Sequence, residues 1–269
     1  MKRSWIGRVL IGSLLVWSLL VGFVHGQAVV VTTTMLESAV RALVGDTIQV
    51  VRLLPPGSCP GHFDLEPNQL RGLSEARVVV RHHFQASMDA TLLKSGLLRE
   101  RIAVVETAEP MTIPSQYAKA AVFLARRLTT AFPEQASSIG LRLGVVREMA
   151  RLREDKIRDR CARLSGRKVI SAVHQVDFCS WLGLEVVGVF ESGAEESARN
   201  LGRVVALARA GGAELVVGNL QWGTRHLEAL SENTSLPGAM LSSFPVTGRP
   251  DAYWDLVERN VAALLRGMP

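Results

Sequence analysis

The stretch REMARLREDKIRDRCARL, residues 147–164, decides the fold, because it is the most strongly charged and amphipathic part of one long helix between two similar halves. The helix is predicted to begin near residue 134, although Gly140 and Gly144 weaken its first half. Gly166 then ends it, in the position where glycine commonly follows a helix. The sequence therefore predicts a helical connector over residues 134–166.

On both sides of this connector, short apolar runs alternate with helical segments. Continuous Val/Ile/Leu runs between helices are typical of parallel strands that are covered on both faces. The strands predicted are residues 28–32, 48–54, 77–80 and 102–105 before the connector, and 169–173, 186–189, 215–218 and 240–242 after it. Further helices are predicted at residues 35–43, 67–75 and 251–265. The predicted class is α/β, with two Rossmann-like lobes of mostly parallel sheet (27–133 and 167–269) joined by one long bridging α-helix.

Residues 1–26 have the pattern of a secretory signal peptide. A basic start is followed by an apolar run over residues 9–24, and a cut before Gln27 would follow small or apolar residues. That run is shorter than the roughly 20 residues that a membrane-spanning helix needs. We therefore expect a periplasmic protein, exported through an N-terminal signal peptide and not membrane-spanning after cleavage.

Half of the formal net charge of +6 belongs to the predicted signal peptide. Loss of Lys2, Arg3 and Arg8 takes Lys and Arg from 31 to 28 against 25 Asp and Glu, which leaves +3. Hydrophobic residues at 48% and charged residues at 21% are ordinary for a globular protein and exclude a disordered chain. So small a positive balance on an exported protein gives no reason to expect a nucleic-acid partner.

Histidines that follow predicted strands are the main candidates for chemistry. His62 lies in the loop after the second strand, His82 and His83 follow the third, and His174 follows the first strand of the second half. In open α/β sheets, ligands bind beyond the carboxyl ends of the strands, and imidazole suits zinc and similar metals. His226 lies within a predicted helix and is interpreted as a surface residue. The pattern predicts a metal site in the cleft between the lobes.

Three cysteines leave two roles open. In an oxidising compartment, Cys59, Cys161 and Cys179 allow three disulfide pairings with one thiol left over. A Cys59–Cys179 bridge would hold the lobes shut, whereas Cys161 could pair with Cys179 within the second half. Cys59 also lies three residues before His62, so its thiolate is a candidate metal ligand.

Familiar enzyme motifs are missing from the sequence. It has no GxSxG elbow, HExxH helix, phosphate-binding glycine loop or GxGxxG turn. Carboxylates near the expected cleft are Asp64, Glu66, Asp177 and Glu191, but the sequence does not pair them as acid and base. We therefore expect a protein that is not an enzyme.

Four segments resemble the metal-binding solute-binding proteins of bacterial zinc/manganese ABC importers. LLPPGSCPGHFDLEPNQLRGLSEARVVV (53–80) is similar to the family's first-ligand loop, and SAVHQVDFCSWLGLEVVGVF (171–190) to its histidine after the first strand of the second lobe. Residues 195–221 and the closing helix DAYWDLVERNVAALL (251–265) extend the resemblance across nearly the whole mature chain. It implies two α/β lobes with a metal site in the cleft between them.

The resemblance implies that His62 is the first metal ligand and His174 the third. The family's second-ligand region reads EPMTIPSQYAKAAV here, without a histidine, and Phe244 followed by proline stands where an aspartate usually provides the fourth ligand. His83 is the preferred second ligand, and because alternate side chains of a strand point opposite ways, His82 is not expected to bind with it. The fourth ligand stays open among Cys59, Asp177, Glu191 and water.

The resemblance implies a monomeric periplasmic protein that captures a divalent metal and delivers it to an inner-membrane ABC permease. Three histidines with a further donor favour Zn²⁺, and Mn²⁺, which prefers oxygen ligands, is the less favoured ion. One alternative is a carrier of a chelated metal (siderophore, haem or cobalamin), for which Trp181 and Trp222 are the candidate aromatic lining. Another is a periplasmic zinc metalloenzyme, in which a carboxylate activates metal-bound water.

Overall fold

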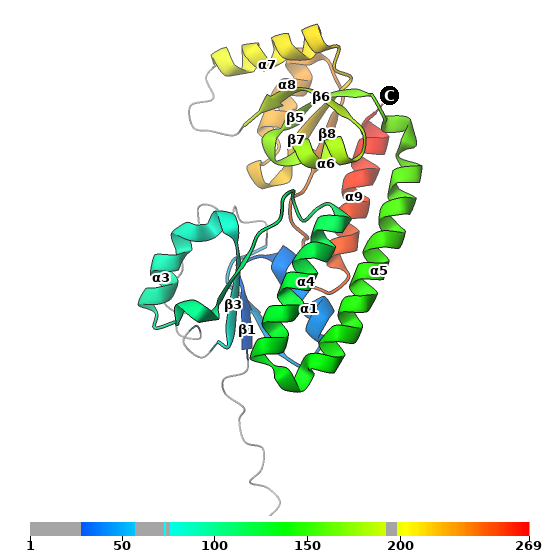
Figure 1. Ribbon diagram of the computed structural model, residues 1–269. Coiled ribbons are helices and arrows are strands. Elements are labelled where there is room, and N and C mark those ends of the chain that lie inside the picture. Colours follow the sequence, from blue (N-terminus) through cyan, green and yellow to red (C-terminus); the bar gives the residue numbers. More distant parts are fainter. Residues whose placement is uncertain (1–27, 57–72, 74–75, 192–197, 269) are drawn as a thin grey trace, which may run out of the picture.

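Two four-stranded parallel sheets form the framework of the chain (Figure 1). The computed structural model describes residues 28–56, 73, 76–191 and 198–268. The predicted signal peptide, the predicted helix at 67–75 except for Leu73, and the loop with Cys59 and His62 lie outside these residues. Both sheets have the same topology, with strand orders β2-β1-β3-β4 and β6-β5-β7-β8, so the predicted pair of parallel α/β lobes is confirmed.

The first sheet brings together short valine-rich strands. They are β1 (Ala28–Val31), β2 (Gln49–Arg52), β3 (Val78–His82) and β4 (Ile102–Val105). Three α-helices and two short 3-10 helices accompany them: α1 (Thr34–Val44), η1 (His83–Met88), α3 (Asp89–Lys94), η2 (Arg99–Arg101) and α4 (Pro114–Ala131). The hydroxyl of Thr33 starts α1 by accepting the amide of Leu36 at 3.3 Å, and Pro114 opens α4 at a position that suits proline.

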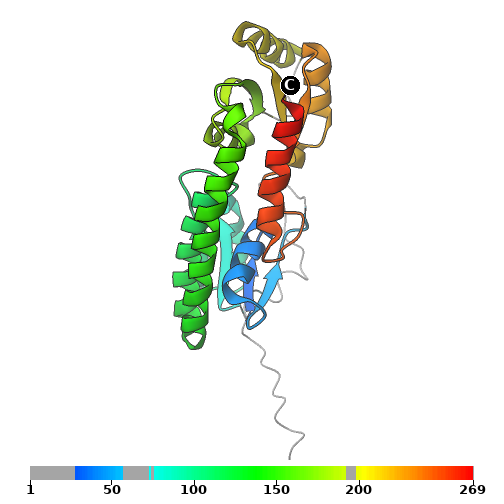
Figure 2. The same cartoon turned by 90° about the vertical axis from the view of Figure 1, so that its right-hand side faces the viewer.

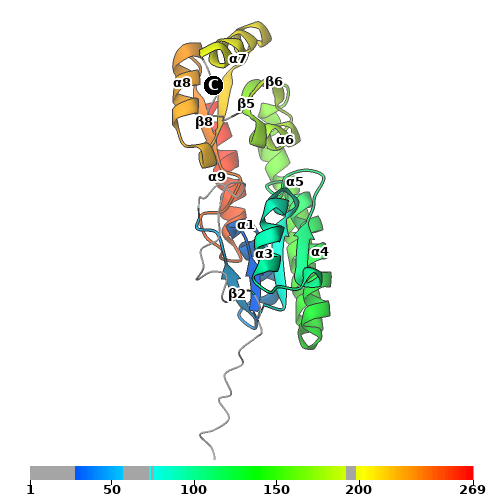
Figure 3. The same cartoon turned by 90° about the vertical axis from the view of Figure 1, so that its left-hand side faces the viewer.

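The second lobe repeats this arrangement. Its strands are β5 (Lys168–Ala172), β6 (Glu185–Phe190), β7 (Leu215–Asn219) and β8 (Gly238–Leu241). Its helices are η5 (Val173–Gln175), α6 (Val176–Trp181), α7 (Ala198–Gly211), η6 (Leu220–Trp222) and α8 (Arg225–Thr234). Figure 3 shows α7 at the end of this lobe that points away from the first lobe.

Two long helices join the lobes. The predicted connector is α5 (Ala136–Arg160), preceded by η3 (Pro133–Gln135) and followed by η4 (Ala162–Leu164). The closing helix α9 (Ala252–Gly267) runs beside α5 from one lobe to the other (Figure 2). Because both helices serve both lobes, one hydrophobic core is continuous from Val29 in β1 to Leu215 in β7, and smaller clusters cover the outer faces of the two sheets.

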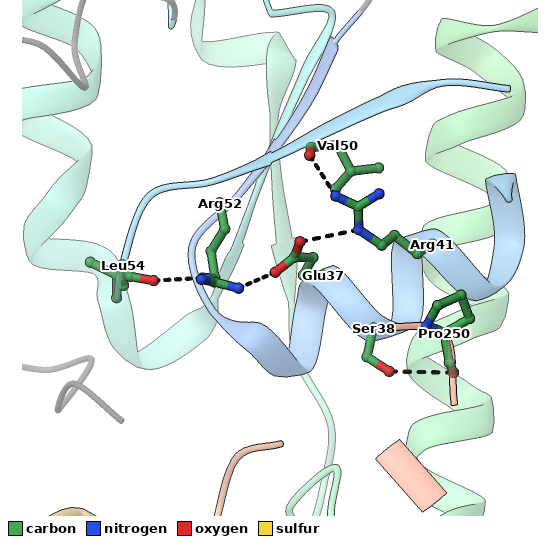
Figure 4. A network of polar contacts seen from close by, with 7 residues as sticks. All are labelled: Glu37, Ser38, Arg41, Val50, Arg52, Leu54 and Pro250. Atoms are coloured by element: carbon green, nitrogen blue, oxygen red, sulfur yellow. Dashed lines mark hydrogen bonds and ion pairs between the residues drawn. The ribbon is translucent and has the colours of Figure 1, made fainter. Parts of the chain in front are cut away.

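A buried carboxylate on α1 fixes the return of the chain from the second lobe (Figure 4). Glu37 is only 8% exposed, and its carboxylate pairs with Arg41 at 3.1 Å and with Arg52 of β2. The connection from β8 to α9 passes over this pair, where Ser38 donates a hydrogen bond to the carbonyl of Pro250 at 3.4 Å. The backbone therefore approaches α1 too closely for any side chain at residue 248, which is glycine.

Replacing Gly248 with alanine is expected to destabilise the protein by about 1–3 kcal/mol, the usual cost of overpacking. A Cβ at this position would collide with the Glu37 carboxylate, which two arginines hold in place. Urea unfolding of the metal-free protein measures the effect. The matched control is Gly140→Ala in α5, where a Cβ meets no atom within 4 Å. This control should be neutral or slightly stabilising, and equal stabilities of the two variants would contradict the packing described.

Candidate metal site

A cavity of about 570 Å³ lies between the lobes, at the carboxyl ends of both sets of strands. The first lobe contributes His82 at the end of β3, His83 and Phe84 directly after it, and a segment after β4 that includes Glu109. The second lobe contributes residues at or beyond the ends of β5, β7 and β8: His174, Asp177, Asn219, Gln221, Trp222, Ser243 and Phe244. Parallel sheets bring the ends of non-adjacent strands to one edge, and the shared helices set the two edges opposite one another.

His83 is the first-lobe imidazole that is open to the cavity. It begins η1, directly beyond β3, and its side chain is exposed. Among the residues that the structure describes, its ring contact is an edge-on approach to Phe84, with centroids 5.4 Å apart. With no side-chain hydrogen bond to those residues, the imidazole can accept a metal ion without first breaking one.

His82 has a structural role, unlike its neighbour. It is the last residue of β3, so the prediction that it lies beyond that strand is wrong: β3 extends two residues past the predicted end at residue 80. Its Nε2 lies 2.9 Å from the hydroxyl of Thr33, and its ring stacks on Phe84 at 4.8 Å. Burial, assisted by the charge of His83, lowers its pKa to about 3. His82 is therefore a neutral side chain that ties β3 to the start of α1.

The buried His82 makes the stability of the metal-free protein sensitive to acid. The unfolded chain binds a proton at this residue below pH 6.5, whereas the folded chain does so only near pH 3, so the free energy of unfolding falls as the pH drops between these values. The contribution to the slope is at most about 1.4 kcal/mol per pH unit. Denaturant unfolding at several pH values should show a shallower slope for His82→Gln, while a slope equal to that of the wild type would contradict this role.

His174 brings the second imidazole to the cavity from the opposite lobe. It lies in η5 beyond β5, with its ring centroid 5.1 Å from that of Trp222. The side chain reaches the cleft surface, yet desolvation by its surroundings lowers its pKa, and the negative charge of Glu191 opposes that shift in part. The net lowering of the pKa leaves a largely neutral imidazole near pH 7, which is the form that binds metal.

The structure brings some of the predicted ligands together and leaves others untested. His83, His174 and Asp177 line one cavity, whereas Cys59 and His62, like Asp64 and Glu66, fall outside the described residues. Across residues 28–56, 73, 76–191 and 198–268, no group of three or more His, Cys, Asp or Glu side chains is close enough to hold a metal ion. A site built from these residues would need the lobes to approach, or a donor from the loop that carries His62.

Only one of the two tryptophans predicted as cleft lining lies at the cavity. Trp222 lines it, but the indole N–H of Trp181 donates to Glu154 of α5 at 3.0 Å, so the prediction for Trp181 is wrong.

The two described cysteines are structural. Cys161 and Cys179 are both free and buried, which rules out the predicted alternative of a disulfide between them. Burial raises the pKa of the Cys179 thiol to about 12, so this cysteine is an unreactive core residue.

The prediction for His226 is correct in its helix and wrong in its exposure. His226 lies in α8, as predicted, but its side chain is half-buried rather than on the surface.

Sequence reasoning missed an amide and hydroxyl network in the wall of the second lobe. The side-chain amide of Gln175 donates to Asn219 at 3.1 Å and to the hydroxyl of Ser243 at 3.0 Å, and Ser243 donates to Asn219 at 3.2 Å. The amide of Ser243 in turn donates to Gln221 at 2.9 Å. This network fixes the position of Ser243, directly before Phe244, which stands where the family pattern has an aspartate.

Comparison with known proteins agrees with this architecture. The family model described as ZnuA, zinc-uptake complex component A, periplasmic, matches residues 29–267. No curated protein sequence matches the chain.

Solved structures of metal-binding proteins share the fold. A zinc-bound deletion mutant of ZnuA is 17% identical and has a TM-score of 0.73, over 88% of this chain and 98% of that one. The solute-binding protein FpvC from Pseudomonas aeruginosa, in complex with Mn²⁺, is 16% identical with a TM-score of 0.74, over 90% and 98%. The laminin-binding protein Lmb of Streptococcus agalactiae, described as an adhesin with metal-transporting activity, is 15% identical with a TM-score of 0.74, over 91% and 100%. Another FpvC structure holds Ni²⁺.

Proposed function

This chain belongs to the zinc-uptake complex component A family, and we propose that it captures a divalent metal, with Zn²⁺ as the favoured ion, and delivers it to an inner-membrane ABC permease. The observation that carries the proposal is one cavity lined by His83 from the first lobe and His174 from the second. Binding to both imidazoles would draw the lobes together, so the permease could recognise the loaded protein by its shape.

We assign the metal to His62, His83 and His174, with Cys59 as a further donor. His83 and His174 already face the same space, and the loop that carries Cys59 and His62 follows β2 in the sequence, whose carboxyl end lies at the same sheet edge. Nitrogen and sulfur donors suit Zn²⁺ better than Mn²⁺. The similar structures hold Zn²⁺, Mn²⁺ or Ni²⁺, so the preference for zinc rests on the donor set of this chain.

The predicted export of the chain supports the same proposal. The family description is periplasmic, and residues 1–26 have the composition of a cleavable signal peptide. In the part of the chain that the structure describes, no helix has the length and apolar character needed to cross a membrane. We propose that the mature protein meets its metal in the periplasm, and works there as a monomeric transport component rather than as an enzyme.

A carrier of a chelated metal is the second candidate. The cavity of about 570 Å³ is much larger than a single ion, and Phe84, Trp222 and Phe244 add aromatic surface to its wall. Aromatic side chains suit an organic chelator, whereas a bare ion gains nothing from them.

Elemental analysis of the protein purified from metal-replete cells distinguishes these functions. The proposal predicts about one equivalent of zinc and no organic molecule in a denaturing extract analysed by mass spectrometry. A metal that appears together with a stoichiometric organic chelator would favour the second candidate. Protein that carries neither metal nor chelator, and that takes up no Zn²⁺ on addition, would contradict both.

A further inference from the structure

Basic side chains gather at the end of the first lobe that lies farthest from the cavity. They come from residues 94–101, between the last residue of α3 and the start of β4, and from residues 123–127 of α4. The cavity lies at the carboxyl ends of the strands, whereas η2 lies at the amino end of β4, and the turn from α4 to α5 points away from the second lobe (Figure 1). We call the following side chains the basic patch: Lys94, Leu98, Arg99, Phe123, Arg126 and Arg127.

A hydrogen bond to the backbone joins the two segments. Nη2 of Arg127 donates to the carbonyl of Glu100 at 2.6 Å, which fixes α4 against η2. Arg99 and Arg126 directly precede these two residues, and their side chains are exposed. The two segments therefore form one continuous surface at this end of the lobe.

The positive charge of the basic patch is not neutralised within the fold. In the described part of the chain, no carboxylate lies within ion-pair distance of any basic side chain of the patch. The arginines of the bridging helix differ, because many of them have carboxylate partners. Arg151 pairs with Glu148 at 2.7 Å, and Arg160 pairs with Glu258 of α9 at 2.6 Å.

The patch accounts for the whole positive balance of the predicted mature chain. Residues 94–101 and 123–127 hold five Lys and Arg against one Glu. Of the 28 basic and 25 acidic residues that follow the predicted signal peptide, 23 and 24 then remain elsewhere. Stabilisation of a helix end does not explain the arginines of α4, because the last turn of that helix holds no basic residue.

Two exposed apolar side chains lie among these charges. Leu98 is 50% exposed directly before Arg99, and Phe123 is 36% exposed one helical turn before Arg126. Basic side chains beside exposed apolar ones are typical of proteins that bind a membrane surface, where the charges attract anionic head groups and the apolar groups enter the interface. An acidic peptide would pair with the arginines but would leave the two apolar side chains without a partner.

The chain also enters the first lobe at this end. The carbonyl of Ala28, where β1 begins, accepts the amide of Arg77 at 3.1 Å. Nη1 of Arg101 donates to the neighbouring carbonyl of Ala76 at 3.2 Å. The predicted signal peptide therefore joins the fold at the end that carries the basic patch, and this end is nearest to the membrane while that peptide is attached.

We propose that the basic patch binds the surface of an anionic phospholipid bilayer and so holds the exported protein at the inner membrane. The basic side chains contact the phosphate groups, and Leu98 and Phe123 enter the interface between the head groups. The patch lies at the opposite end of the first lobe from the cavity, so binding of lipid and binding of metal are independent.

The test is sedimentation of the full mature protein with vesicles of phosphatidylglycerol and phosphatidylcholine, or of phosphatidylcholine alone. The double variant Arg99→Gln/Arg126→Gln removes two charges of the patch. The matched control Arg225→Gln/Arg259→Gln removes two exposed arginines of α8 and α9 that have no ion pair among the described residues. Urea unfolding and the Kd for Zn²⁺ should be the same in both double variants, which shows that the fold and the cavity are retained.

The wild-type protein is expected to bind the anionic vesicles, more weakly as salt is added, and not the neutral ones. The patch variant should bind about 30-fold more weakly, because each basic residue near an anionic surface contributes a factor of about five, while the control stays within about two-fold of the wild type. Equal losses in the two variants overturn the proposal, because they would reflect net charge alone. Wild-type protein that does not bind anionic vesicles overturns it too, and its retention on immobilised polyglutamate would then indicate an acidic protein partner. Neither result affects metal capture, which the Zn²⁺ titration measures separately.

Discussion

Replacing His174 with alanine is expected to abolish tight metal binding and to leave the fold intact. His174 is the imidazole that the second lobe presents to the cavity, so without it the metal would be held by one lobe alone. Loss of a direct ligand should weaken Zn²⁺ binding by more than the roughly 10–100-fold that is typical for residues that only support a ligand. Competition with a chromophoric chelator measures the Kd.

The control for this variant is a second histidine of the same lobe. His226 lies in α8 and is absent from the wall of the cavity, so His226→Ala should bind Zn²⁺ as the wild type does. Because His174 is exposed on the cleft surface, its replacement should change the free energy of unfolding by less than about 1 kcal/mol. A His174→Ala variant that keeps wild-type affinity would remove the second lobe from the site.

Replacing Tyr253 with alanine is expected to cause the largest loss of stability, about 3–5 kcal/mol. Tyr253 of α9 is fully buried and stacks on Tyr117 of α4, with ring centroids 3.6 Å apart. Its hydroxyl also donates to the carbonyl of Thr112 at 3.3 Å, in the cavity wall of the first lobe. This ring therefore anchors the helix that returns from the second lobe, and its removal leaves a cavity where the lobes are joined.

Tyr253→Phe separates the ring from the hydroxyl. Phenylalanine keeps the stacking on Tyr117 and loses one hydrogen bond, so it should cost about 1 kcal/mol. Urea unfolding of the two metal-free variants gives the comparison. If Tyr253→Ala proves no more destabilising than Tyr253→Phe, the stacked pair does not contribute to the joining of α9 and α4.

The fold could be predicted because its signals are local. Runs such as AVVV in β1 are apolar along their whole length, and the long charged helix marks the boundary between two repeats of the same pattern. The helix α4 is absent from the predicted elements, although Pro114 and the alanine-rich stretch after it favour a helix. The end of β3 lies two residues beyond the predicted one, at His82, because pairing with β4 continues to that residue.

Only those residues of the candidate site that directly follow a strand could be predicted from the sequence. His83 and His174 follow strands directly, so their position at the sheet edge could be deduced from the sequence. The place of Glu109 in the cavity wall could not be deduced, because a hydrogen bond from Gln116, in the first turn of α4, orients its side chain. The sequence around Trp181 and Trp222 does not show which of them lines the cleft. In the structure Trp181 packs against α5, and only Trp222 of the two lines the cavity.

Capture of one metal ion between the lobes is tested most directly by calorimetric titration of chelator-stripped wild-type protein with Zn²⁺. The structure places two imidazoles from different lobes on one cavity wall, which predicts saturation at one ion per chain with a Kd below about 1 μM. A titration without saturable heat, or one that saturates only at several weakly bound ions per chain, would contradict the account.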